Sequence, residues 1–534
     1  MRNGAVLAVA LFAAPPILAD GAGETTMPLP EGHLVYTEYR MLARTDKHNE
    51  LVWRLENLVG RNEETFEVRS AVFSYEDLMT GKGRVFLRLG PLPQERPDTT
   101  VPDITVDTRK RLLTVHDNGY PFVALDYEGG RRGRTKALQD YQRSVRPYVP
   151  GRDGVFMSNT WGDRSQDARV CESFMLREIE AAAELGLDAV QIDDGWQKGK
   201  SINAVNAGTN GVFIGFWRAN PHFWEPDEKK FPQGLGNVAK AAKEKGVRLG
   251  LWFCPDSADD AASWERDAAL MLDYHRRFGV DFFKLDSLRT TSKLAFSRQR
   301  MLFERIMKET NGRLVIDLDV TADKRPGYFG ILEAGPLFVE NRYTDWHTYW
   351  PHLTLRALWS LVEVIDPVRL RIEVLNPERN KEKYMGDPLA PSAYPPETIF
   401  AIAMPASPLG WFETQGLSPD TVRAWRPLVA VWKREREAMA ACNVFNVGAK
   451  PDGLSWTGFV SVPRNAGDPG YALFFREKSK SPRFDFDFLE YFPRDSRIEV
   501  LSPRGRADMN GVVVEKPLDF AWLRFTPKEG KCNE

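Results

Sequence analysis

The feature that most constrains the fold of this 534-residue chain is a regular alternation of short apolar runs and helical segments between about residues 150 and 440. Several helical segments stop at a glycine, as helices commonly do. About eight strands alternating with helices indicate a (β/α)₈ barrel. A doubly wound sheet is the alternative, but no Gly-rich nucleotide-binding turn follows the first strand. The expected strands are 155–159, 189–192, 247–253, 280–285, 314–318, 336–340, 369–374 and 402–405.

Two regions of a different character flank the expected barrel. Short β-type runs separated by Gly, Pro and Asp turns precede it and follow it, which favours a β-sandwich on each side. We therefore expect an N-terminal sandwich at 20–147, the catalytic barrel at 148–437 and a C-terminal sandwich at 438–534.

Residues 1–19 have the pattern of a secretory signal peptide. Arg2 precedes a mostly apolar stretch that ends at Ala19, a small residue suited to cleavage. The pattern predicts a secreted or periplasmic protein, and a cytosolic tail is the alternative. In an oxidising compartment Cys442 and Cys532 could form a disulfide, which the sequence leaves open. No later run approaches the roughly 20 apolar residues of a membrane span, so we expect no membrane partner.

The charge balance excludes some partners. The 72 Lys and Arg against 74 Asp and Glu leave a net charge of −2, which disfavours nucleic acid as a partner. The chain has only 7 His and neither a His-x-x-x-His nor a Cys-x-x-Cys pair, so a zinc site is not expected. We expect no cofactor, and the oligomeric state, including a homo-oligomer, is left open.

Carboxylates and tryptophans follow six successive expected strands, at the end of a barrel where active sites form. An Asp in such a place often only caps a helix or forms a turn, but six in succession are harder to explain that way. Acids that accept from hydroxyl groups, together with indole rings that stack on C–H faces, fit a neutral polyol. An oxygen-ligated Mg²⁺ or Ca²⁺ site is the rival interpretation. The segments are 159–163, 193–196, 252–256, 284–287, 317–319 and 340–346.

Three of these segments resemble the melibiase-type family of retaining α-galactosidases, in a clan with α-N-acetylgalactosaminidases and raffinose synthases. Asp193-Asp194-Gly-Trp196 resembles the family's motif after strand two, and residues 250–252 resemble its Gly-Leu-Trp strand. Lys284-Leu-Asp286 resembles its Lys-x-Asp motif of strand four. The resemblance covers about residues 145–290, and the family layout of sandwich, barrel and sandwich also fits.

The resemblance implies a role for each of these residues. Asp286 would be the nucleophile, and the acid/base would be Asp345, with Glu340 in reserve. The remaining side chains would hold or enclose the sugar. They are Trp161, Asp193, Asp194, Trp196, Trp252, Lys284 and Arg342, and Glu340 if it is not the acid.

The chain departs from the family at two of the strand ends. Residues 316–321 replace the Gly-rich, Cys-containing signature of strand five, and Cys254-Pro-Asp256 replaces the acidic motif of strand three. These positions shape the subsites around the sugar. They put the identity of the substrate in doubt more than the mechanism.

The expected activity is hydrolysis of terminal α-linked sugars through a covalent glycosyl-aspartate. Lys284, on the same strand face, is expected to favour the charged form of Asp286, and the two catalytic carboxyls should lie roughly 5–6 Å apart. A non-catalytic sugar-binding relative, a raffinose-synthase-like transglycosidase and a metal-dependent barrel enzyme are the alternatives. The substrate is expected to be an oligosaccharide or other glycoside.

Overall fold

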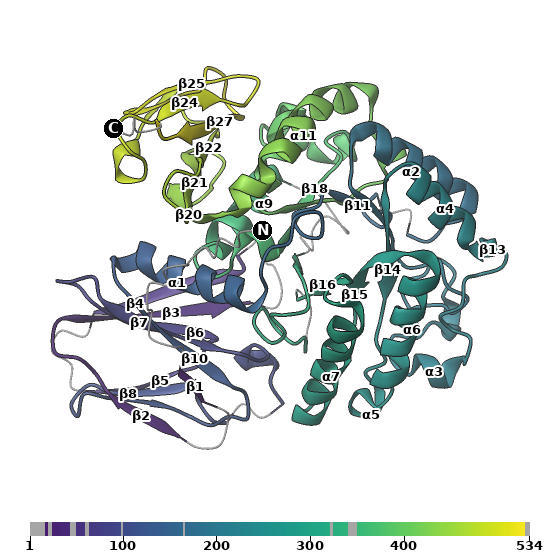
Figure 1. Cartoon of the computed structure of the whole chain (residues 1–534), viewed down its shortest axis with the longest axis horizontal. Coiled ribbons are helices and arrows are strands. Elements are labelled where there is room, and N and C mark those ends of the chain that lie inside the picture. Colours follow the sequence, from purple (N-terminus) through teal and green to yellow (C-terminus); the bar gives the residue numbers. More distant parts are fainter. Residues whose placement is uncertain are drawn as a thin grey trace, which may run out of the picture.

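Two antiparallel sheets form the N-terminal part of the molecule, seen at the lower left of Figure 1. The computed structural model describes residues 17–19, 24–42, 50–58, 64–97, 100–163, 166–320, 324–339 and 350–528. The six-stranded sheet has the order β1-β10-β7-β6-β3-β4 and the four-stranded sheet the order β2-β9-β8-β5. Apolar side chains of both sheets, such as Phe73 and Val106, share one buried cluster, so the pair is a sandwich.

The bounds of these strands are β1 Ile17–Ala19, β2 Thr25–Pro28, β3 Leu34–Met41, β4 Val52–Leu58, β5 Thr65–Val68, β6 Val72–Asp77, β7 Gly83–Arg88, β8 Ile104–Asp107, β9 Leu112–Val115 and β10 Phe122–Tyr127. The last three residues of the expected signal peptide form β1, which pairs with β10. Residues 1–16 lie outside the described part of the chain.

The central part is a closed barrel of eight parallel strands, which confirms the predicted fold class. Its strands are β11 Met157–Asn159, β12 Ala189–Ile192, β14 Arg248–Phe253, β15 Val280–Leu285, β16 Val315–Asp319, β17 Leu337–Val339, β18 Leu370–Val374 and β19 Ser407–Gly410. Every residue of β12, β16, β17, β18 and β19 is buried, as expected for strands covered on both faces.

Helices surround this barrel on the right of Figure 1. They include α2 Glu172–Leu185, α4 Gly236–Glu244, α6 Trp264–Phe278, α7 Lys293–Thr310, α9 Pro351–Leu361, α10 Pro396–Ala403 and α11 Pro419–Ala440. Short elements in the connections are β13 Pro232–Leu235, α3 Phe216–Ala219 and α5 Ala258–Ala261. α2 and α6 end at Gly186 and Gly279, whose φ angles of 90° and 64° are left-handed and therefore suit glycine.

The predicted eighth strand was wrong. Ile402 and Ala403 belong to the end of α10, and the strand that closes the barrel is β19, a few residues later. All residues from Thr398 to Ala403 are buried, so the helix has no polar face and its apolar run is indistinguishable from a buried strand in the sequence. Pro396, at the start of the helix, occupies a position that proline favours.

The C-terminal part consists of two small antiparallel sheets that share an aromatic core. One sheet has the order β20-β21-β22-β27-β24 and the other the order β23-β26-β25. The strands are β20 Cys442–Gly448, β21 Trp456–Pro463, β22 Gly470–Arg476, β23 Arg483–Asp485, β24 Arg497–Val500, β25 Arg506–Asp508, β26 Gly511–Val513 and β27 Asp519–Thr526. Cys442 is buried at the start of β20. Cys532, whose pairing with Cys442 the sequence left open, lies outside the described residues.

Helix α1 (Gly130–Val145) connects all three parts. Gln139 donates to the carbonyls of Val362 and Val444, at 3.1 and 2.8 Å, which belong to the barrel and to β20. Gln142 donates to the Val364 carbonyl and accepts from Arg369, both at 2.8 Å. These buried amides join the domains, although the expected domain bounds placed residues 130–145 in the N-terminal domain.

Candidate active site

Asp286 follows β15 directly, at the carboxyl end of the barrel. Its Oδ1 accepts from the Ser287 backbone N–H at 2.6 Å and from Arg325 Nη2 at 2.8 Å. The indole N–H of Trp252 lies 3.5 Å from Oδ2. The Asp286 side chain is 16% exposed, so it is partly accessible while its orientation is fixed from several sides.

The loop after β15 adopts an unusual backbone to hold this geometry. Ser287 has a φ of 50°, in the left-handed region that non-glycine residues rarely adopt. Its hydroxyl donates to the Phe213 carbonyl, and its own carbonyl accepts from the Ser257 hydroxyl, both at 3.0 Å. These contacts stabilise the turn that presents the carboxylate.

Lys284 and Asp193 form a buried ion pair next to Asp286 in the barrel mouth. Lys284 Nζ lies 2.9 Å from Asp193 Oδ2, and the side chains are 5% and 3% exposed. The same carboxylate oxygen accepts from Asn159 at 2.7 Å. Lys284 also lies over the rings of Phe338 and Trp411, 4.6 and 4.7 Å from their centroids, which favours its cationic form.

Asp194 is as buried as Asp193, and it holds the loop after β12. Its oxygens accept from Gln197 at 2.7 Å and from the Ser201 hydroxyl. Burial raises the pKa of Asp194 from 3.8 to about 7, and the charge of Asp193 contributes in the same direction. The structure therefore gives the two aspartates of the motif different surroundings.

The three predicted pocket tryptophans occupy different places. Trp252 reaches Asp286, and Trp161 is half-buried beside the end of β11. Trp196 has no exposed surface, because it packs against Trp224 and Tyr274 and donates its indole N–H to the Trp252 carbonyl at 2.9 Å. Trp196 therefore supports Trp252 rather than lining the mouth. Trp252 is itself only 1% exposed, so neither indole ring forms the pocket wall that was predicted.

The acids in the two departures from the family pattern are also buried. Asp317 accepts from Arg371 Nε at 2.7 Å, and Asp319 Oδ2 lies 3.8 Å from Arg325 Nη2. Asp256 accepts from the backbone N–H groups of Gly215 and Ala258 at 2.7 and 3.0 Å, so it organises a loop.

Three predicted site residues lie outside the described part of the chain. They are Glu340, Arg342 and Asp345, in the segment 340–349 between β17 and α9. The acid/base assignment and its distance from Asp286 therefore stay predictions.

Arg325, the cation in contact with Asp286, was not among the predicted site residues. It lies in the connection between β16 and β17, several residues beyond the strand end, where no motif marks it. A basic residue followed by Pro326 and Gly327 is typical of an ordinary turn in the sequence.

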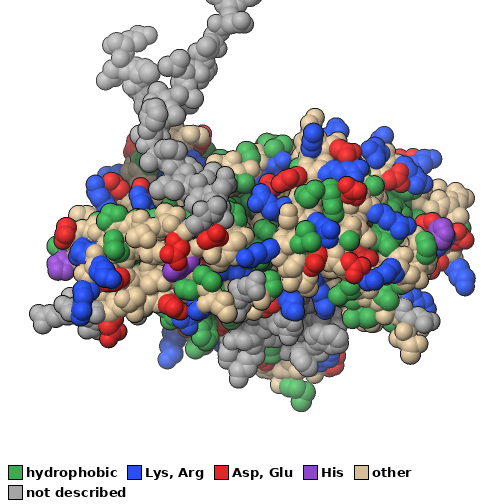
Figure 2. Space-filling model, turned by 90° about the horizontal axis from the view of Figure 1, so that it is seen from below, with side chains coloured by type: hydrophobic (Ala, Val, Ile, Leu, Met, Phe, Trp, Pro, Cys, Tyr) green, Lys and Arg blue, Asp and Glu red, His purple; other side chains and the backbone are tan. Residues whose placement is uncertain are grey.

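The described residues show neither a metal-binding cluster nor a membrane-spanning helix. No group of three or more His, Cys, Asp or Glu side chains there is arranged to hold a metal ion. Among the same residues, no helix combines the length and the apolar character needed to cross a bilayer. Figure 2 shows basic and acidic side chains mixed over one face of the molecule rather than gathered by sign.

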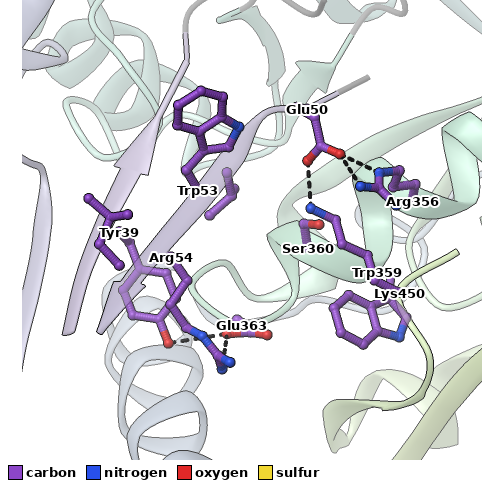
Figure 3. A pocket seen from close by; sticks show the side chains of 11 residues that line it. Tyr39, Glu50, Trp53, Arg54, Arg356, Trp359, Ser360, Glu363 and Lys450 are labelled. Atoms are coloured by element: carbon purple, nitrogen blue, oxygen red, sulfur yellow. Dashed lines mark hydrogen bonds and ion pairs between the residues drawn. The ribbon is translucent and has the colours of Figure 1, made fainter. Parts of the chain in front are cut away.

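A separate cavity of about 770 Å³ lies away from Asp286, between β3, β4 and α9 (Figure 3). Its charged groups bind one another. Glu50 contacts Arg356 and lies 2.5 Å from Lys450 of the C-terminal part, and Glu363 accepts from the Tyr39 hydroxyl at 3.2 Å. This cavity is a junction between the three parts of the chain.

The fold and the mouth together define a barrel-centred protein with a carboxylate held between donors at the end of the fourth strand. The chain matches no protein-family model. It is 30% identical over 155 residues to α-galactosidase 2 of Pediococcus pentosaceus and 31% identical over 83 residues to the α-galactosidase of Escherichia coli. These matches span 29% and 16% of this chain but only 18% and 10% of the relatives.

Solved structures share the architecture over nearly the whole chain. The α-galactosidase of Lactobacillus brevis superposes with a TM-score of 0.68, covering 96% of this chain and 76% of that one, at 12% identity. The GH36 α-galactosidase AgaA of Geobacillus stearothermophilus, in complex with raffinose, gives 0.66, with 94% and 76% covered at 12% identity. The fold is therefore shared, and with the sequence matches it confirms that the chain is related to the melibiase-type α-galactosidases.

Proposed function

We propose that the protein is a retaining α-glycosidase, α-galactosidase-like, that is exported and acts on terminal α-linked sugars of oligosaccharides. The observation that carries the proposal is Asp286, a partly exposed carboxylate at the end of β15 whose Oδ1 is held by Arg325 and by a backbone N–H. The matched relatives are named as α-galactosidases, and AgaA was solved with raffinose, which supports this substrate class.

The reaction needs a charged attacker and a proton donor on opposite sides of the anomeric carbon. Asp286 attacks that carbon, and the bond to the leaving oxygen breaks as an acid protonates it. Asp345, or Glu340 in reserve, is the acid. Water then attacks the glycosyl-Asp286 ester, its proton passes to the same acid/base, and the Asp286 carboxylate leaves.

The neighbours of Asp286 fit this chemistry. Lys284 and Asp193 place a charged donor and an acceptor beside the attacking group, where sugar hydroxyls would bind. The partly exposed Trp161 provides flat apolar surface for a sugar ring, whereas Trp252 is 1% exposed and contacts Asp286 through its indole N–H. The sequence predicted that Lys284 would favour the charged form of Asp286. Arg325, which forms an ion pair with Asp286, supplies positive charge as well.

A panel of aryl α-glycosides tests the proposal. We expect the α-galactoside to be cleaved fastest, with the first-formed sugar retaining the α-configuration by NMR. Inclusion of an acceptor sugar separates transglycosylation, which would give a new oligosaccharide, from hydrolysis. Binding of the sugar without cleavage of any member of the panel would instead identify a non-catalytic relative.

A further inference from the structure

Arg325 is unusual in being almost completely buried while it contacts the candidate nucleophile. Its side chain is 6% exposed, and Nη2 donates to Asp286 Oδ1. Its Nε and Nη1 atoms are buried without a hydrogen-bond partner among the described groups. Burying a guanidinium in this way is costly, because the charge loses its hydration and part of its hydrogen bonding. The position is therefore poorly explained by stability alone.

The two oxygens of Asp286 are held differently. Arg325 and the Ser287 N–H both contact Oδ1, at 2.8 and 2.6 Å. The contact of Oδ2 with Trp252 is longer, at 3.5 Å, and an indole carries no formal charge. Two short donors on one oxygen fix the plane of the carboxylate and direct the other oxygen toward the Trp252 side of the mouth.

Other titratable groups lie around Asp286. Lys284, two residues away on β15, pairs with Asp193, and Asp194 is buried with a pKa raised to about 7. The Cys254 thiol is kept neutral, because burial and then the charge of Asp286 raise its pKa well above the usual value. Asp319, 3.8 Å from Arg325 Nη2, is a second carboxylate near the same cation.

We propose that Arg325 is a positioning residue that keeps Asp286 ionised and selects Oδ2 as the attacking oxygen. This rests on the proposed function. The negative charge of Asp286 is consumed when Oδ2 bonds to the anomeric carbon and the leaving oxygen departs. It returns when water displaces the ester and the carboxylate is released. Arg325 therefore assists most in the second step, because it stabilises the carboxylate as a leaving group.

Hydrolysis of an α-galactosyl fluoride tests the role of Arg325. Fluoride departs with little need for an acid, so the rate of its release reports on attack by Asp286. Glutamine at position 325 keeps polarity but removes the charge. We expect Arg325→Gln to move the acidic limb of the kcat/KM profile upward by about one to three pH units. It should also raise the fraction of enzyme trapped as the ester, measured by mass spectrometry after rapid quenching.

Asp319→Asn provides an independent variant with the opposite expected sign. Removing this carboxylate leaves the charge of Arg325 to act on Asp286 alone, so the acidic limb should move to lower pH. Arg371→Gln is the matched control, since it removes the charge of another buried guanidinium of the barrel, which is 1% exposed and pairs with Asp317. It should lower the melting temperature without moving the limb.

An unchanged limb in a folded Arg325→Gln variant would overturn the inference. If that variant does not fold, an unchanged or raised limb in Asp319→Asn has the same meaning. Absence of turnover by the wild-type protein with every α-glycosyl fluoride would instead refute the proposed function, so the two failures are distinguishable.

Discussion

The barrel mouth and the cavity between β4 and α9 are both rich in charge, but their charges are used differently. In the cavity, Glu50 is held by Arg356 and Lys450, and Glu363 by Arg131 at 2.5 Å, so cations hold each carboxylate. In the mouth, Asp286 also contacts a cation, Arg325, but it follows a barrel strand and its side chain is 16% exposed. The carboxylates of the cavity join domains, whereas the carboxylate at the barrel mouth is placed to react. Substitutions in the barrel mouth and in the cavity test this difference.

The largest effect is expected at Asp286. Asp286→Asn removes the attacking charge, so kcat/KM should fall on the order of 10⁴-fold or more. The melting temperature should fall moderately, because the amide fills the same space but the buried Arg325 loses its charged partner. Kinetics on an aryl α-galactoside and thermal melting check both parts. Normal turnover by this variant would show that another group attacks.

Lys284 is expected to matter for both stability and activity. Lys284→Met leaves Asp193 as a buried charge without this partner, which should lower the free energy of unfolding by about 3–5 kcal/mol. Substrate binding should weaken as well. Denaturant unfolding and KM measure the two effects. Wild-type stability in this variant would mean that the ion pair is not formed in solution.

Asp194 is expected to make stability depend on pH. Its folded-state pKa of about 7 lies above the reference value of 3.8, so the folded protein holds this proton more tightly than the unfolded chain. Its contribution is therefore fully present below about pH 4 and is lost as the pH rises toward 7, with a slope of up to about 1.4 kcal/mol per pH unit. Asp194→Asn should remove that slope. Denaturation curves at pH 5 and pH 7 for both proteins check this, and equal slopes would contradict it.

The smallest effect is expected in the interdomain cavity. Glu50→Gln weakens partly exposed contacts with Arg356 and Lys450, so the free energy of unfolding should fall by only about 1–2 kcal/mol. The kcat should not change, because none of the described contacts of Glu50 reaches the mouth. A large loss of kcat in Glu50→Gln would show that the cavity and the mouth are coupled.

The sequence predicted the barrel well where an alternating pattern was reinforced by glycine stops. β12 and β15 have the expected bounds. α2 and α6 end at Gly186 and Gly279, as expected for helical segments that stop at a glycine. The closing strand was misplaced, because α10 is buried on all sides and has no amphipathic pattern.

The candidate site was predicted in part. The motif residues Asp193, Lys284 and Asp286 lie together as expected, since the parallel strands of a closed barrel bring their carboxyl ends to one mouth. The contact of Arg325 with Asp286 depends on the path of a loop, and no local pattern encodes such a path. Likewise, the sequence cannot show that Trp196 supports Trp252 from beneath, because a tryptophan after a strand suits both positions.

The position of α1 has a consequence for dividing this protein into parts. A barrel excised at residue 148 would lose Gln139, Gln142 and Arg143, and with them the partners of the Val362 carbonyl, Arg369 and Asp366. Those groups are buried, and after the excision they would have no hydrogen-bond partners in place of the lost side chains. An autonomous catalytic fragment should therefore begin before Gly130. A barrel that is transplanted into another scaffold must include α1.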